Sequence, residues 1–98
     1  MENLLLKRTV EPLLAALAVF VKQRRIELGM SQIELANRSG LHRTYVSDVE
    51  RGNRNLTLGA SMLLANGLGV QLKDIVLAID QGSGKELELE RALSAEAA

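Results

Sequence analysis

Four side chains on one short predicted helix have the clearest capacity for chemistry in this sequence. Residues 31–52, SQIELANRSGLHRTYVSDVERG, contain two short helical patterns that a glycine separates. On the second pattern, Arg43, Thr44, Ser47 and Asp48 fall on the outward face. Together they present a fork of N–H donors, two hydroxyls and a carboxylate. Such a set favours hydrogen bonding to another molecule, and the question is which molecule that face meets.

The composition argues against catalysis and against a metal or cofactor. Cysteine is absent, which excludes disulfides and thiolate metal sites. His42 is the only histidine, and no carboxylates are spaced to join it as metal ligands. The sequence also has no acid pair and no glycine loop of the kind that cradles phosphate. We therefore expect a protein without enzyme activity that uses no metal, cofactor or small-molecule ligand.

One apolar run could suggest a membrane segment. LLAALAVFV, residues 13–21, is about half as long as the roughly 20 residues that a transmembrane helix needs. Glu11 precedes it, and the basic KQRR follows it where a signal peptide needs small residues. We expect this run to be a buried helix in a cytoplasmic protein that does not contact a membrane.

Charge is distributed unevenly along the chain, although the net charge is zero. Residues 1–55 contain nine Lys and Arg against six Asp and Glu, whereas residues 56–98 contain three against six. A basic half that also carries the outward polar face is typical of a side that meets phosphate. The asymmetry is a mild indication of a nucleic-acid partner.

The helical patterns predict an all-α fold with one domain. Pro12 is expected in the first turn of the first helix, and Gly29 is expected to end that helix. Ser31 and Glu34 predict a capping box, and Thr57 predicts another N-cap. The five predicted helices cover about residues 12–28, 31–40, 42–51, 57–67 and 72–80.

The chain divides into three predicted segments. Residues 1–11 are an N-terminal arm or a helix extension, residues 12–80 are the compact domain, and residues 81–98 are an acidic tail. GSG after Gln81 reads as a hinge, so we expect the tail to be flexible; the weaker alternative is a helix that binds a partner.

The core follows from the inward-facing positions of these helices. The predicted core residues are Leu14, Leu17, Val21, Leu28, Ile33, Leu35, Ala36, Tyr45 in part, Val46, Val49, Leu58, Met62, Leu64, Ala65 and Leu68. Helices as short as the second and third are unstable alone, so the rest of the domain must hold them. Ala36 permits close contact between them, and Gly40 allows the positive φ that their turn requires. These features predict a helix-turn-helix unit.

RRIELGMSQIELANRSGLHRTYVSDVERGNRNLTL resembles the DNA-binding domain of lambdoid phage repressors, Cro proteins and their bacterial relatives, the Xre family. The likeness covers about residues 17–77, and LHRTYVSDVERGNRNLT is most similar to the small controller proteins of restriction–modification operons. It implies a compact five-helix repressor-like domain whose third helix reads the major groove, usually as a homodimer on a two-fold symmetric operator. We therefore expect a sequence-specific transcriptional regulator that binds double-stranded DNA, with RNA polymerase as a further candidate partner.

The resemblance also implies roles for individual residues. The expected base readers are Arg43, Thr44, Ser47 and Asp48. The expected phosphate contacts are Gln32, His42, Tyr45, Arg54, Asn55 and Arg38, with Lys22, Arg24 and Arg51 as further candidates. Arg25 and Glu50 match the positions of a structural ion pair between the first and third helices.

Some of these roles have alternatives. Arg43 suits guanine, whose O6 and N7 an arginine binds bidentately. Asp48 could accept a hydrogen bond from cytosine, hold a nearby arginine, or face away. His42 could serve only as a helix cap. Departures from the family pattern also appear: Ser39 is expected to loosen the packing of helices two and three, and Gly67 to cost its helix roughly 1 kcal/mol relative to alanine.

Apolar residues on the fifth helix and its approach predict a dimer interface. They are Val70, Leu72, Ile75, Val76 and Ile79. A two-fold dimer would place two recognition helices about 34 Å apart, one turn of DNA. The alternative function is an antitoxin-type, phage or plasmid repressor whose tail binds a protein partner.

Overall fold

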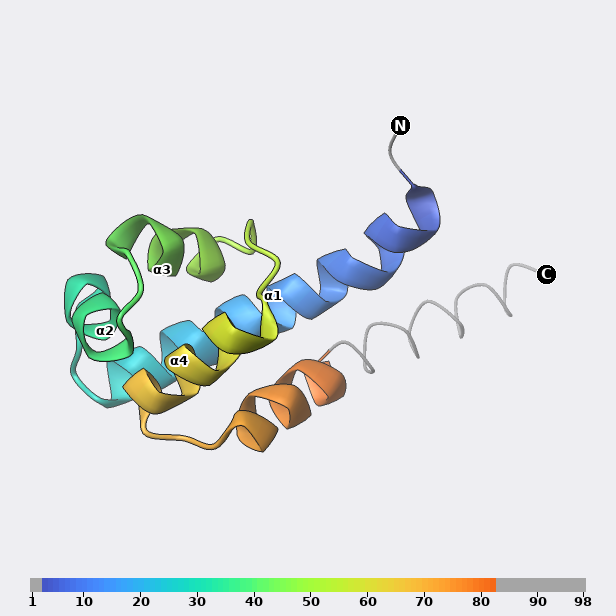
Figure 1. The fold of residues 1–98 in the computed structure, drawn as a ribbon. Helices are drawn as coiled ribbons and strands as arrows, with labels where there is room; N and C mark the ends of the chain where they lie inside the picture. The colour runs from blue at the N-terminus through green and yellow to red at the C-terminus, as the bar shows by residue number, and fades with distance from the viewer. Residues whose placement is uncertain (1–2, 83–98) are drawn as a thin grey trace.

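The computed structural model describes residues 3–82 and shows an all-α domain of five helices, as predicted (Figure 1). Predictions for the tail beyond Gly82 lie outside the described residues. The helices are α1 (Leu4–Glu27), α2 (Gln32–Ser39), α3 (Arg43–Glu50), α4 (Leu58–Leu68) and a last helix, Leu72–Gly82. In Figure 1, α1 runs the length of the molecule, α2 and α3 lie near its C-terminal half, and the last helix returns along it. Gly82 marks that return, because a Cβ built on it would lie 2.8 Å from the Cβ of Ala16.

The predicted start of α1 was wrong by two turns. The helix begins at Leu4, so Pro12 lies inside it and not in its first turn. The Asn3 side chain caps this start of α1 by accepting hydrogen bonds from the N–H groups of Leu5 and Leu6, at 3.0 and 3.2 Å. Because these terminal donors already have a partner, the helix can form ahead of the proline. The described part of residues 1–11 is therefore a helix extension, which was one of the two predicted alternatives.

The core lies where α1, α2, α3 and α4 meet, and the last helix closes it. Its buried residues are Leu17, Val21, Met30, Leu35, Ala36, Val46, Val49, Leu64, Ala65, Leu68 and Ile75. Tyr45 packs partly against it, as predicted. Short aliphatic side chains in this number suit helices that cross closely, since interiors are packed to the density of organic crystals.

Three predicted core residues are instead exposed: Ile33 at 49%, Leu58 at 77% and Met62 at 47%. Ile33 lies in the first turn of α2, and the buried face of that helix is formed by Leu35, Ala36 and Ser39. Leu58 is the first residue of α4, and the buried residues of that helix begin at Ala60. Helical spacing alone did not show which of several apolar faces would meet a neighbour. Leu28, at 40% exposed, is a fourth case at the end of α1.

The helix ends around α2 explain how the turn into α3 is made. The Ser31 Oγ accepts the Glu34 N–H at 3.1 Å, which is the predicted N-cap, and the Ser31 hydroxyl lies 3.4 Å from the Glu34 carboxylate. Gly40 ends α2 with a φ of 77°, a left-handed conformation that costs glycine nothing. His42 then caps α3, so the two helices are set at their angle by local bonds on both sides of the turn.

Ser39 and Gly67 form a tight contact between α2 and α4, which corrects the prediction that Gly67 only weakens its helix. Ser39 is 4% exposed, and its hydroxyl donates to the Ala36 carbonyl at 3.2 Å. A Cβ at Gly67 would lie 2.9 Å from the Cβ of Ser39 and 3.1 Å from Leu35 Cδ1. Ser39 therefore packs closely against α4, and Gly67 is the residue that permits this approach.

We expect Gly67→Ala to lower the free energy of unfolding by roughly 1–3 kcal/mol, the usual cost of overpacking a core. Gly59→Ala is the matched control, because its added Cβ meets nothing within 4 Å. That change should be neutral or stabilising by up to about 1 kcal/mol through helix propensity. Urea unfolding followed by circular dichroism measures both. Equal stability of the two variants would contradict a tight contact at Gly67.

Within residues 3–82, no single helix is long and apolar enough to cross a membrane. Leu58–Leu68 and Leu72–Gly82 reach the required length and composition only as a pair, bent by 105°. Three of the apolar side chains in this pair, Leu64, Leu68 and Ile75, are buried in the core.

Candidate nucleic-acid interface

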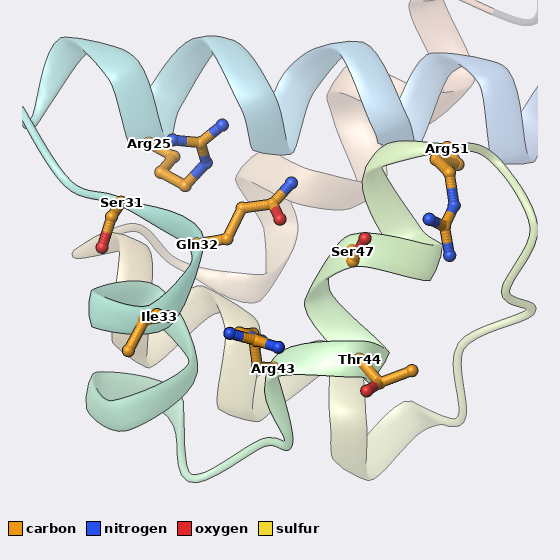
Figure 2. A pocket seen from close by; sticks show the side chains of 8 residues that line it. All are labelled: Arg25, Ser31, Gln32, Ile33, Arg43, Thr44, Ser47 and Arg51. Carbon is orange, nitrogen blue, oxygen red and sulfur yellow. The ribbon is translucent and has the colours of Figure 1, made fainter.

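The outward edge of α3 borders a cleft of about 600 Å³ that lies between α3 and the first turn of α2. The residues that line it are Arg25, Ser31, Gln32, Ile33, Arg43, Thr44, Ser47 and Arg51 (Figure 2). Figure 2 shows Gln32 extending from the start of α2 toward α3, with Arg43 and Thr44 at the first turn of α3. The cleft therefore brings together three of the four expected base readers, and Arg43 and Thr44 are exposed there.

A charged pair beneath the cleft fixes α3 to α1. Arg25 Nε and Nη2 donate to the two carboxylate oxygens of Glu50 at 2.7 and 2.8 Å. Arg25 Nη1 also donates to the Met30 carbonyl at 2.8 Å, so one side chain connects α1, the α1–α2 turn and α3. The Glu50 side chain is only 3% exposed. A bidentate geometry of this kind holds both groups in one orientation.

The same pair favours the charged form of the guanidinium, which is protonated at physiological pH in any case. The hydrogen bonds that Arg25 donates to the Glu50 carboxylate raise the pKa of Arg25 above its usual value; burial opposes this rise, and the negative charge of Glu50 adds to it. Gln32 Nε2 donates to Glu50 Oε1 at 3.3 Å, which orients the Gln32 amide in the lining of the cleft.

His42 is the N-cap of α3. Its Nδ1 accepts the Thr44 N–H at 3.1 Å, which is the cap that the sequence left as one of two alternatives. Because Nδ1 acts as an acceptor, Nε2 is left to carry the ring proton and can donate to another group. The cap and a phosphate contact are therefore compatible roles for this side chain.

Asp48 contacts two arginines at the far end of α3. Its Oδ1 pairs with Arg51 and its Oδ2 accepts from Arg54 Nη2 at 3.3 Å. The Arg54 guanidinium also lies over the Tyr45 ring, 4.5 Å from the ring centre, in a cation–π contact. Of the alternatives for Asp48, holding a nearby arginine is the arrangement in the structure.

Other residues with expected roles lie outside the cleft or are occupied elsewhere. Arg38 and Asn55 are exposed. Arg24, a candidate for phosphate contact, instead donates from Nε to the Leu68 carbonyl at 3.0 Å and pairs with Glu27 at 3.6 Å. Arg24 therefore has a structural contact with the C-terminal end of α4.

The expected dimer surface needs one correction. Ile75 is 1% exposed and belongs to the core of the monomer, because the last helix turns this residue toward α1 and α4. Val70 and Ile79 are partly buried against the same core, and Leu72 is also partly buried. Val76 is 56% exposed, and Leu77, which the sequence did not single out, is 51% exposed.

The sequence did not assign Ser31 or Ile33 to the site. Ser31 was interpreted as a cap, which it is, and the first turn of α2 also places it at the cleft. Ile33 was assigned to the core because it is apolar. The signal in the sequence for a surface role was that Ile33 directly follows Gln32, in the first turn of α2.

Comparison with known proteins agrees with the helix-turn-helix geometry described above. The sequence profile of the helix-turn-helix family matches residues 21–75. The control protein C.BamHI of Bacillus amyloliquefaciens is 48% identical over 58 residues, which is 56% of this chain and 72% of that protein.

Solved structures agree. The wild-type restriction–modification controller protein C.Esp1396I superposes with a TM-score of 0.64 at 37% identity, over 71% of this chain and 92% of that one. The tetramer of C.Esp1396I in complex with its natural 35-base-pair operator superposes with a TM-score of 0.61 at 38% identity, over 68% of this chain and 93% of that one. On the profile match and these similarities, the chain belongs to the Xre-type helix-turn-helix family of DNA-binding transcriptional regulators.

Proposed function

We propose that this protein binds a two-fold symmetric operator as a homodimer and regulates transcription by occupying that site near a promoter. The observation that carries the proposal is the exposed edge of α3, where Arg43, Thr44 and Ser47 border one cleft. The ion pair of Arg25 and Glu50 holds this edge rigidly against α1. Rigid presentation of a short helix is what entry into the major groove requires.

In the proposed complex, each part of the site has its own role. Arg43 binds guanine O6 and N7, and Thr44 offers its methyl group to thymine or its hydroxyl to phosphate. Ser47 lies one turn further on the same edge. The phosphate contacts come from residues around this edge: Gln32, His42, Arg38, Tyr45, Arg51, Arg54 and Asn55. Such contacts set the register of the protein on the duplex and carry no sequence information directly.

A homodimer is supported by exposed apolar side chains on the last helix. Val76 and Leu77 are more than half exposed, next to partly buried Ile79. Two copies that join through this surface would double the phosphate contacts and present two copies of α3. C.Esp1396I binds its operator as a tetramer, which supports a multi-subunit complex for this chain too. The similarity to C.BamHI and C.Esp1396I favours a restriction–modification controller as the narrower role.

The expected result for Arg43→Ala is a loss of preference at one base position in each half-site. Selection from a random duplex library, followed by anisotropy titration at several salt concentrations, measures it. Discrimination at that position should fall by roughly 1–3 kcal/mol, while the salt slope stays nearly unchanged.

Arg38→Ala is the matched control, because it removes the same side chain from an exposed position on α2. It should weaken binding to all sequences alike and reduce the salt slope by about one. The proposal fails if the wild-type protein enriches no symmetric site, or if Arg43→Ala behaves like Arg38→Ala.

A further inference from the structure

Residues 43–55, which the structure describes throughout, combine three arginines with two acids at the edge proposed to meet DNA. Glu50 turns inward, where Arg25 neutralises it. Asp48 is different, because its carboxylate lies on the same side of α3 as Arg51 and Arg54 and contacts both. An anion at a surface that meets a polyanion opposes binding, so its presence there calls for a physical account.

The contacts of Asp48 restrain the two arginines separately. One carboxylate oxygen pairs with Arg51 Nη2 and the other accepts from Arg54 Nη2. Arg54 is restrained further by the Tyr45 ring beneath it, and its Nε is buried with no hydrogen-bond partner among the described residues. Its guanidinium therefore has a defined plane and direction. The Asp48 side chain is 23% exposed, so water screens these pairs less than it would a fully exposed pair.

The restraint still leaves donors for DNA. A guanidinium carries five N–H donors, and Asp48 occupies one nitrogen of each arginine. Arg51 and Arg54 are 60% and 43% exposed, so their remaining donors can reach a phosphate that lies in the right place. A phosphate in any other place would have to draw an arginine away from Asp48.

We propose that Asp48 is a specificity-determining positioning residue that limits binding to non-operator DNA. This inference rests on the proposed function and adds a mechanism by which the protein discriminates its operator from other DNA. Non-specific binding depends on flexible cations that adapt to whatever phosphates are near. Arginines that Asp48 holds cannot adapt without the loss of an ion pair, whereas the operator register presents phosphates to them as they stand. Asp48 therefore weakens non-specific binding more than it weakens binding to the operator.

The test is Asp48→Asn, which keeps the shape of the side chain and removes its charge. Affinity for a random duplex should rise roughly 3- to 10-fold at low salt, with a salt slope steeper by about one, as expected when one more cation reaches phosphate. Affinity for the selected operator should change less than about twofold, so the specificity ratio falls. Glu27→Gln makes the same charge change on α1, away from the cleft, and should leave the ratio unchanged.

A second variant identifies the route of the effect. In a background of Arg51→Gln and Arg54→Gln, Asp48→Asn should no longer change the non-specific affinity or its salt slope. Persistence of the full effect there would show a simple charge effect and overturn the inference. An altered preference at one base pair would make Asp48 a base reader, and weaker binding to both DNAs would make it a direct contributor to affinity; either also overturns it.

These outcomes are distinct from failure of the proposed function. If the wild-type protein selects no operator, the proposed function fails whatever the Asp48 variants do. If it selects one and Asp48→Asn leaves the non-specific affinity unchanged, only the role of Asp48 is rejected. Thermal unfolding of each variant confirms that the comparison is made between folded proteins.

Discussion

Arg25→Met is expected to lower the free energy of unfolding by about 3–5 kcal/mol, because it leaves the Glu50 carboxylate buried without its partner. This is a large share of the roughly 5–15 kcal/mol by which domains are usually stable. Among residues 3–82, that carboxylate would keep the 3.3 Å hydrogen bond from Gln32. Denaturation in urea, monitored by circular dichroism, gives the change directly.

The control for this prediction removes both charges. Arg25→Met combined with Glu50→Leu should recover much of the lost stability, since apolar replacement of a whole buried pair is often close to neutral. A double variant as unstable as the sum of the two single variants would show that the pair is not coupled. Because α3 depends on this pair for its position, lost DNA binding in the single variant would report on folding and not on contact.

Leu35→Ala is expected to cost about 2–5 kcal/mol, since Leu35 is fully buried and its removal leaves a cavity between α2 and α4. Ile33→Ala, two residues earlier on the same helix, should change stability by less than about 1 kcal/mol, because that side chain is half exposed. Comparison of the two variants controls for the introduction of alanine at neighbouring positions on α2. Similar losses in the two variants would mean that Ile33 packs against the body.

Local signals predicted the helix ends well. Ser31, Thr57 and Gly40 each lie where the sequence placed them, because a cap or a left-handed turn depends on the chemistry of one or two neighbouring residues. The helix-turn-helix arrangement followed from the same signals. Asn3 is an equally local signal for the start of α1, whereas Pro12, from which the first turn was predicted, lies inside the helix.

Long-range contacts were less predictable. Ile75 and Ile33 are both apolar and lie on amphipathic helices, yet one is buried and the other lines a cleft. The difference depends on which helix packs against which, and helical spacing does not contain that information. The candidate site shows the same limit: spacing brought Arg43, Thr44 and Ser47 together, whereas the contacts of Asp48 depend on the loop that returns Arg54 to the Tyr45 ring.

The contact between Ser39 and Gly67 has a consequence for how the sequence can evolve. Because α4 has no room for a Cβ at Gly67, the residues at positions 39 and 67 constrain each other, although they lie far apart in the chain. A lineage that acquires a side chain at 67 first needs glycine at 39 or a shift of α2 relative to α4, because alanine keeps the Cβ that lies 2.9 Å from the added atom. Substitutions at these positions should therefore arise in a fixed order.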